Sequence, residues 1–312
     1  MAPSLSVSPP SAVDVFEEHR RLVWGIAYRM LGSCADADDI VQDTYLRWQT
    51  ADPDEVTSPR AWLITASTRL AIDRLRSVRR RREEYVGPWL PEPILTPPEP
   101  SAQELAELNQ SLSMAFLVLL ERLGPTERAV FLLHEVFDVG HAQIADIVGK
   151  SPIACRQIAT RARKRLTQGR EPLVPRDKKM GLRDRQTVSR FLDALRAADV
   201  DALLALLTAD AQVTSDGGGR VVAARRVVRG ASRSARFLAG LARKWAASAS
   251  LQLIPHQVNY GPGFVLRAGE TVVAVVSLAL DADGRVESVF AVRNPEKLRS
   301  VGLVGPALRK LD

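Results

Sequence analysis

The sequence predicts a multi-domain protein in which two all-α helical modules are followed by an α+β domain. Three observations predict it. Apolar residues recur at helical spacings up to about residue 168, a Pro-rich stretch at 87–101 interrupts them, and β-patterned runs dominate after residue 207. At 312 residues the chain is long enough for two or three domains that each bury a core.

The first helical module is expected at 11–86. A helical pattern runs over about Asp14–Gln49, and a second helix begins at Ser58-Pro59. Serine can cap a helix, and proline is tolerated in the first turn because its missing amide would be unpaired there anyway. This second helix is long and is expected to end near Tyr85.

A Pro-rich linker at 87–101 separates the first module from a second one, expected at 102–168. Repeated prolines exclude a regular helix and favour an extended, semi-rigid segment. In the second module Gly124-Pro125 breaks the helical pattern before the helix that leads to the next motif.

The segment His141–Leu166 predicts a helix-turn-helix. Gly149 and Lys150 form the turn, Ser151 can cap the second helix, and Pro152 follows where a missing amide costs nothing. In this motif the second helix lies in the major groove of DNA.

The second helix of this motif has one apolar face and one polar face. The apolar residues recur at spacings of three and four: Cys155, Ile158, Ala159, Ala162 and Leu166. The outward residues are candidates for contacts with base edges and phosphates: Arg156, Gln157, Thr160, Arg161, Arg163 and Lys164. An ordinary basic surface helix is the alternative, but the turn, the face pattern and the charge together favour DNA binding.

The α+β domain is expected at 185–300, after a polar linker at 169–184. Two amphipathic helices within 185–207 should point these residues inward: Phe191, Leu192, Leu195, Leu203, Leu204 and Leu207. A further helix is expected near 232–247. Candidate strands are Ala211–Ser215, Arg220–Ala224, Leu251–Tyr260, Phe264–Arg267, Thr271–Leu280 and Val286–Arg293.

Composition favours an anionic partner, since the formal net charge is +7. Two cysteines and four histidines show no metal-ligand spacing, so we expect no metal and no cofactor. No stretch approaches eighteen uninterrupted apolar residues, and the N-terminus lacks the pattern of a secretory signal. We therefore expect a cytoplasmic protein with no membrane partner.

An acidic stripe is expected on the first module. Asp36, Asp39 and Asp43 share one helical face by spacings of three and four, with Gln42 beside them. Like charges at this spacing repel, so a basic partner surface would offset their cost. A solvated acidic face is the alternative.

An arginine run closes the long helix after Ser58, with Arg74, Arg76, Arg79, Arg80, Arg81 and Arg82. Such a run can neutralise several phosphates and make binding strongly salt-dependent. The alternative is a solvated charge run in which Arg69, Asp73 and Arg76 form a stabilising ionic stripe.

The order of these parts resembles the extracytoplasmic-function sigma factors of bacterial RNA polymerase, over about residues 11–168. The resemblance implies that the core polymerase is a partner, through its largest-subunit clamp helices and its flap region, and that promoter DNA is another. It implies that Asp39, Gln42 and Asp43 bind these clamp helices. It implies that the long helix opens and reads the −10 element and that the helix-turn-helix reads the −35 element. On the long helix the implied DNA-binding residues are Arg69, Arg76, Arg79 and Arg80, although many relatives carry Asn where this chain has Arg69.

Three short strings narrow the resemblance to the subgroup whose members carry a C-terminal SnoaL-like domain of the NTF2 superfamily. They are WLPEP (Trp89, Leu90, Pro91, Glu92, Pro93), DGGGR (Asp216, Gly217, Gly218, Gly219, Arg220) and NPEKL (Asn294, Pro295, Glu296, Lys297, Leu298). The resemblance implies a cone-shaped domain that regulates the sigma part of the chain. We expect an intramolecular contact between this domain and the linker or first module, which would control how the two DNA-binding modules are spaced.

Catalysis in the cone is the less favoured reading. Its candidate groups are Asp210, Asp216, His256 and Tyr260, but spacing pairs no base with a donor, and Asp216 is better explained by a Gly-rich turn. Two other functions stay open: a ligand-sensing one-component helix-turn-helix regulator, and an NTF2-like enzyme fused to a DNA-binding module.

The C-terminal domain also contains a strongly basic segment. Residues 217–269 include no acidic residue but these nine basic ones: Arg220, Arg225, Arg226, Arg229, Arg233, Arg236, Arg243, Lys244 and Arg267. This half of the domain should be electropositive, and could face DNA or the acidic residues of the first module and linker.

Overall fold

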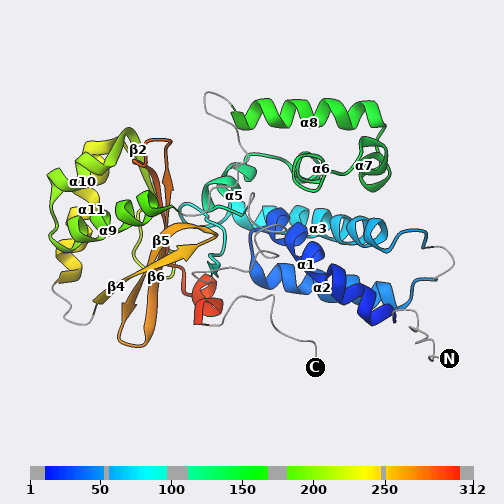
Figure 1. The fold of residues 1–312 in the computed structure, drawn as a ribbon, viewed down its shortest axis with the longest axis horizontal. Coiled ribbons are helices and arrows are strands. Elements are labelled where there is room, and N and C mark those ends of the chain that lie inside the picture. Colours follow the sequence, from blue (N-terminus) through cyan, green and yellow to red (C-terminus); the bar gives the residue numbers. More distant parts are fainter. Residues whose placement is uncertain (1–10, 53–55, 97–111, 168–180, 247–250, 303–312) are drawn as a thin grey trace, which may run out of the picture. The chain divides into compact units, whose positions relative to one another are not determined.

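A computed structural model describes residues 11–52, 56–96, 112–167, 181–246 and 251–302 of the chain (Figure 1). The chain divides into two compact units. One contains residues 1–76 and 125–160, and the other contains residues 77–124 and 161–312. The first is helical, and the second contains helices and a seven-stranded sheet, as the predicted fold class requires.

The first unit begins with α1 (Ala12–Leu31) and α2 (Cys34–Gln49), followed by α3 (Pro59–Glu83). The helical pattern predicted over 14–49 is thus two helices. Gly32 divides them: it has φ +65°, a left-handed conformation that ends α1, and its N–H donates to the Tyr28 carbonyl. These helices enclose a core cluster of Phe16, Val23, Val41, Trp48 and Leu63.

The helix-turn-helix forms as predicted. It consists of α7 (His141–Val148) and α8 (Pro152–Thr167), preceded by α6 (Pro125–Glu135). Gly149 has φ +67°, and the Ser151 hydroxyl accepts from the Ala154 amide at 3.2 Å. The whole predicted apolar face of α8 is buried: Cys155, Ile158, Ala159, Ala162 and Leu166. Burial raises the pKa of the Cys155 thiol, consistent with a packing role.

The C-terminal domain is a sheet covered by three α-helices on one face and by a 3₁₀ helix on the other. Its helices are α9 (Leu182–Arg196), α10 (Val200–Leu206) and α11 (Ala231–Ala246), and Pro295–Gly302 forms a 3₁₀ helix, η3. Its strands are β2 (Leu207–Asp216), β3 (Val228–Arg229), β4 (Leu251–Val258), β5 (Gly261–Ala268), β6 (Thr271–Leu280) and β7 (Val286–Val292). With β1 (Leu95–Thr96) at one edge, the order is β1-β4-β5-β6-β7-β2-β3, and only the β2–β7 pair is parallel among the described pairs.

The remaining strand comes from the linker. Leu95–Thr96 forms β1 and pairs antiparallel with β4, matching Leu95 to Val258. The linker is extended, as predicted, but its pairing with the sheet was not foreseen. After the linker, α5 (Met114–Leu120) lies in the same compact unit, where Met114 packs with Leu90 of the linker and Phe290 of β7. The predicted start of the second module at 102 lies outside the described residues.

Two expectations for the domain were wrong. Residues 220–224 are not a strand, because the glycines before them turn the chain and the next pairing with β2 occurs only at Val228–Arg229. Leu204 is 39% exposed, whereas Leu203 and Leu206, three residues apart, are buried. α10 has fewer than two turns before β2 begins at Leu207. Within α10 only Leu203 and, one turn later, Leu206 are therefore buried.

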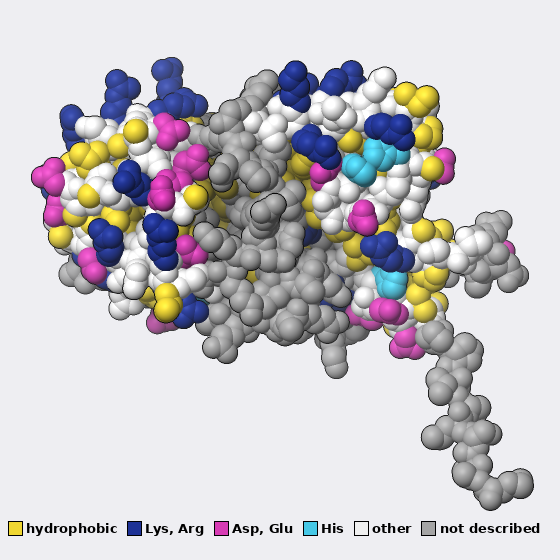
Figure 2. Space-filling view, turned by 45° about the horizontal axis from the view of Figure 1, so that its top comes forward, with side chains coloured by type: hydrophobic (Ala, Val, Ile, Leu, Met, Phe, Trp, Pro, Cys, Tyr) yellow, Lys and Arg dark blue, Asp and Glu magenta, His cyan; other side chains and the backbone are white. Residues whose placement is uncertain are grey.

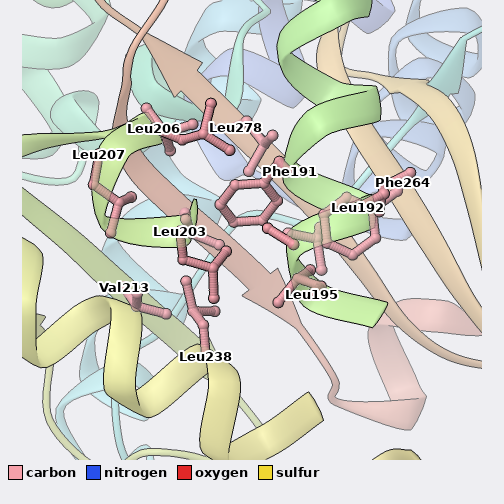
Figure 3. Close-up of a cluster of buried hydrophobic side chains, with 14 of the residues drawn as sticks. Phe191, Leu192, Leu195, Leu203, Leu206, Leu207, Val213, Leu238, Phe264 and Leu278 are labelled. Atoms are coloured by element: carbon pink, nitrogen blue, oxygen red, sulfur yellow. The ribbon is translucent and has the colours of Figure 1, made fainter. Parts of the chain in front are cut away.

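A large hydrophobic cluster fills the space between the helices and the sheet (Figure 3). Phe191 of α9 lies in its middle, near Leu278 of β6 and with its ring 6.2 Å from that of Phe264. The interior of the cone is therefore occupied by side chains. Among the described residues, no helix is both long enough and apolar enough to cross a bilayer.

Replacing Phe191 by alanine should lower the free energy of unfolding of this domain by about 3–5 kcal/mol, because the ring is fully buried and its loss leaves a cavity. Urea titration of the full chain, followed at the transition that includes the sheet, measures the loss. Leu182→Ala is the matched control because Leu182 is 81% exposed. Equal effects of the two substitutions would contradict this view of the core.

Candidate functional site

The acidic stripe of α2 lies on the surface, but two of its carboxylates already pair with one arginine. Arg74 of α3 donates to Asp36 at 2.8 Å through Nε, and also lies 3.5 Å from Asp39. The hydrogen bond to Asp36 raises the pKa of Arg74 further above its ordinary value. Gln42 and Asp43 are exposed, and Asp39 is 65% exposed. The stripe that is available to a partner is therefore the part from Asp39 to Asp43.

The arginine run of α3 is not a uniform cationic surface. Three of its members have carboxylate partners: Arg74 with Asp36, Arg76 with Asp73 at 3.0 Å, and Arg82 with Glu121 at 2.7 Å. The side chains of Arg80 and Arg81 lie outside the described set, and Arg79 is exposed. Arg74, Arg76 and Arg82 must therefore exchange these carboxylates before they can bind phosphate.

Arg69 binds backbone carbonyls of α7, a contact that the sequence around it did not predict. Its guanidinium donates to the backbone carbonyls of Asp146 at 2.7 Å and Ile147 at 3.3 Å. Both carbonyls lie at the C-terminal end of α7, where carbonyls outside the helical ladder and the helix dipole favour a cation. Of the predicted ionic stripe, the Asp73–Arg76 pair forms, and Arg69 instead joins α3 to the helix-turn-helix within the first compact unit.

All six outward residues predicted on α8 are exposed: Arg156, Gln157, Thr160, Arg161, Arg163 and Lys164. The Thr160 hydroxyl donates to the Arg156 carbonyl at 3.0 Å, which occupies its proton within the helix. The other five project side chains that can hydrogen-bond to base edges or phosphates.

The three sequence strings meet in one place, around the DGGGR turn. Asp216 ends β2, and its backbone carbonyl accepts from the amides of Arg293 and Asn294 where β7 ends. Gly218 has φ +60°, and a Cβ there would lie 2.4 Å from the Asn294 amide nitrogen and 2.9 Å from the Tyr85 hydroxyl. Glycine is thus required both by the backbone conformation and by the close approach of Asn294 and Tyr85.

The Asp216 carboxylate is fully buried and accepts four hydrogen bonds. One oxygen accepts from the Tyr85 hydroxyl at 2.6 Å and from the Gly218 amide at 3.0 Å. The other accepts from the Leu90 amide at 2.9 Å and from the Lys297 ammonium at 2.7 Å. A buried charge is tolerated when it is paired and its remaining lone pairs are satisfied, and both conditions hold here.

The Lys297 ammonium is held by carbonyl, carboxylate and aromatic groups together. It donates to the Leu90 carbonyl and to Asp216, and lies 4.1 Å from the ring centroid of Trp89. Arg82 lies over the same ring at 3.5 Å. Burial lowers the pKa of Lys297 to about 8, with Asp216 acting in the opposite direction. Burial, followed by the hydrogen bond to Asp216, raises the pKa of Tyr85 and keeps its hydroxyl a donor.

Asn294 and the neighbouring residues complete this group, which we call the linker clamp: Tyr85, Trp89, Leu90, Asp216, Gly218, Asn294 and Lys297. The Asn294 side-chain amide donates to the Tyr85 hydroxyl at 2.8 Å, and its oxygen accepts from the Glu296 amide at 3.0 Å. Arg220 pairs with Glu296 at 3.0 Å. Pro295 begins η3, Leu298 packs on the cluster around Leu90, and the linker residues Pro91, Glu92 and Pro93 are buried.

A second attachment fixes the far end of the described linker. The Ile94 amide donates to the Asn259 side-chain oxygen at 3.1 Å, and the Asn259 amide donates to the Ile94 carbonyl at 2.8 Å. Asn259 is fully buried and has φ +52°, a conformation that Asn tolerates better than most residues. Sequence reasoning missed Asn259 and Tyr85. In the sequence Asn259 indicates only a turn, and Tyr85 lies outside all three short strings.

The proposed catalytic groups are not gathered into a site. Asp210 is exposed near Thr208, His256 lies on β4 beside the Gln257 carbonyl, and Tyr260 lies in the turn before β5. Asp216 is enclosed by the linker clamp. Within the described ranges, no group of three His, Cys, Asp or Glu residues could hold a metal ion.

Comparison with known proteins identifies two matching family models and several relatives that cover most of the chain. The family models Sigma-70 region 2 and Sigma-70, region 4 match residues 15–81 and 113–166. The ECF RNA polymerase sigma factor SigJ of Mycobacterium tuberculosis is 36% identical over 294 residues, covering 91% of this chain and 92% of the relative. The probable ECF RNA polymerase sigma factor SigI of the same species is 29% identical over 290 residues, covering 90% and 92%. The crystal structure of SigJ aligns with a TM-score of 0.73 at 32% identity, covering 92% of this chain and 98% of that one.

Asp216→Asn should detach the linker from the domain. Asparagine has one acceptor oxygen and places an NH₂ group against donors. Lys297 loses its counter-ion, so its buried ammonium must either stay charged without a partner or lose its proton. Breaking a buried pair in this way costs about 3–5 kcal/mol. Amide hydrogen exchange at Leu90 in the full chain should accelerate by at least a hundredfold, whereas Asp210→Asn, at an exposed carboxylate on the same strand, should leave it unchanged. Unchanged protection of Leu90 in Asp216→Asn would count against the clamp.

Proposed function

This chain belongs to the extracytoplasmic-function RNA polymerase sigma factors, and we propose that its SnoaL-like domain regulates promoter recognition by holding the linker between the two DNA-binding modules. The observation that carries the proposal is the buried Asp216 carboxylate, which binds the Leu90 backbone of that linker directly. Membership in this family favours a sigma factor over the one-component regulator, the alternative function that composition and motifs had left open.

Core polymerase binding is assigned to α2. Asp39, Gln42 and Asp43 are exposed along one face and are the positions to which the family resemblance assigns the clamp helices of the largest subunit. The buried residues Ile40 and Val41 fix this face by anchoring the opposite side of the helix. The second module would contact the flap region.

Promoter DNA is assigned to α3 and α8. The exposed residues of α8 would read the −35 element, with Arg156 and Gln157 nearest its N-terminal end, where such helices contact base edges. On α3, Arg69, Arg76, Arg79 and Arg80 remain the proposed −10 contacts. Arg69 must first leave the carbonyls of α7, and Arg76 must first exchange Asp73 for a phosphate.

The linker clamp would regulate the protein by shortening the part of the linker that is free to move. Residues from Leu90 to Thr96 lie on the C-terminal domain, held by Asp216 at one end and by Asn259 and β4 at the other. A linker whose middle is fixed cannot extend or rotate freely, so the distances that the two DNA-binding modules can span become restricted. Opening the clamp requires separating a buried ion pair, which gives the domain control over that restriction.

Charge reversal on α2 tests core binding. Asp39→Arg combined with Asp43→Arg should weaken the affinity of the full chain for core polymerase by at least tenfold, because it places cations where the partner surface is expected to be basic. Glu18→Arg, an exposed reversal on α1, should change affinity less than twofold. Fluorescence anisotropy of the labelled chain with core enzyme gives both values. A similar loss for both variants would remove the assignment to α2.

Promoter spacing tests the regulation. In transcription reactions with core polymerase and a promoter series that varies the −35 to −10 spacer, the full chain should show a sharp optimum. Asp216→Asn and the chain ending at residue 167 should both transcribe over a wider range of spacers, because their linkers are free. Asp210→Asn should keep the sharp optimum. An equally narrow optimum for all four proteins would refute control of spacing by the clamp.

A further inference from the structure

Seven exposed basic residues lie on consecutive elements of the C-terminal domain, and together we call them the arginine face. It extends over the loop after the DGGGR turn, β3 and α11, and consists of Arg225, Arg226, Arg229, Arg233, Arg236, Arg243 and Lys244. In the part of the chain that the structure describes, none of the seven is paired with a carboxylate. Figure 2 shows Lys and Arg side chains projecting from the domain that carries these elements.

The arginine face is not needed for packing. α11 buries Ser234, Ala235, Leu238 and Ala239 against the domain core, which leaves its basic residues on the outside. Other arginines of the same acid-poor segment do have partners: Arg220 pairs with Glu296, and Arg267 with Glu270 at 3.1 Å. Like charges concentrated without counter-ions repel one another, so the surface suits an anionic partner.

The chemistry of the face favours the phosphates of duplex DNA. Six of the seven residues are arginines, whose planar guanidinium groups bind phosphate in a bidentate manner. From Arg233 to Lys244 the helix rises about 16 Å. A duplex carries one negative charge per ~1.7 Å of axis, so a helix of this length can meet several phosphates.

Stacking on single-stranded bases is disfavoured, because the aromatic residues of α11 are turned to the core. Phe237 and Trp245 both pack against the hydrophobic cluster of the domain. A surface that binds single strands combines cations with exposed aromatic rings, and the arginine face has only the cations. Its contacts would therefore be with the backbone and would not depend on base sequence.

A short segment of chain tethers the domain that carries this face to the proposed −35 helix. α8, the proposed −35 helix, ends at Thr167, and α9 begins at Leu182. Even fully extended, the chain between them spans at most about 50 Å. Tethering over such a distance makes a weak second contact intramolecular and so raises its occupancy.

We propose that the arginine face binds the phosphate backbone of duplex DNA beside the −35 element, as a third, sequence-independent contact of this sigma factor. The proposal goes beyond regulation through the linker. It uses only the surface of the domain, so it stands or falls separately from the linker clamp.

The salt dependence of DNA binding tests the proposal. Arg229→Gln combined with Arg233→Gln is compared with Arg185→Gln combined with Arg190→Gln, which removes the same charge from exposed positions on α9. Holoenzyme made with each full chain is titrated with a promoter duplex that extends upstream of the −35 element. The slope of log K against log salt should become less steep by about 0.9 for each phosphate that the face variant no longer neutralises, and should not change in the control.

Three further measurements separate the alternatives. Replacing Arg229 and Arg233 by lysine should restore most of the slope, because the charge is kept. The free chain, without polymerase, should show the same difference between variants on a non-promoter duplex, which keeps this test independent of sigma activity. Equal slopes for face and control variants would overturn the proposal. The proposal would also be overturned if the face variant lost affinity for core polymerase in the absence of DNA. The partner of the face would then be an acidic protein surface.

Discussion

The buried pair of Asp216 and Lys297 is the interaction on which the arrangement of the second compact unit depends. A carboxylate with no exposed surface must have its charge and lone pairs satisfied, and here the satisfying groups come from three separate segments of the chain. Tyr85 and Leu90 lie in the segment from the end of α3 into the linker, Gly218 lies in the turn, and Lys297 lies in η3. Removing any one segment would leave a buried polar group without its partner.

This constraint changes what the linker is. A Pro-rich segment has few amides to donate, yet the amides of Leu90 and Ile94 both find acceptors on the C-terminal domain. Leu95 and Thr96 then pair with β4 and add an edge strand to the sheet. The segment between the two DNA-binding modules is therefore partly built into the domain that follows them.

Two groups of arginines can be distinguished: those of α3 that already bind a group within the chain, and those of the exposed arginine face. Arg74, Arg76 and Arg82 have carboxylate partners, and Arg69 donates to the end of α7. These arginines must exchange partners before they can bind phosphate. The arginine face is exposed and, among the described residues, has no carboxylate to give up. Charge density in the sequence did not distinguish the two kinds.

The sequence alone determined the features that depend on near neighbours. Turn chemistry at Gly149–Ser151 and the spacing of apolar residues specify the helix-turn-helix, because caps and helical faces involve residues at most four apart. Three short strings marked the linker, the turn and η3. Only the tertiary structure decided that these strings meet, that Tyr85 and Asn259 join them, that β1 extends the sheet, and that Arg69 faces α7. Tyr85 and Asp216 lie 131 residues apart, and Leu90 and Lys297 lie 207 apart. Contacts at such separations depend on how all the intervening elements pack, and no local pattern records them.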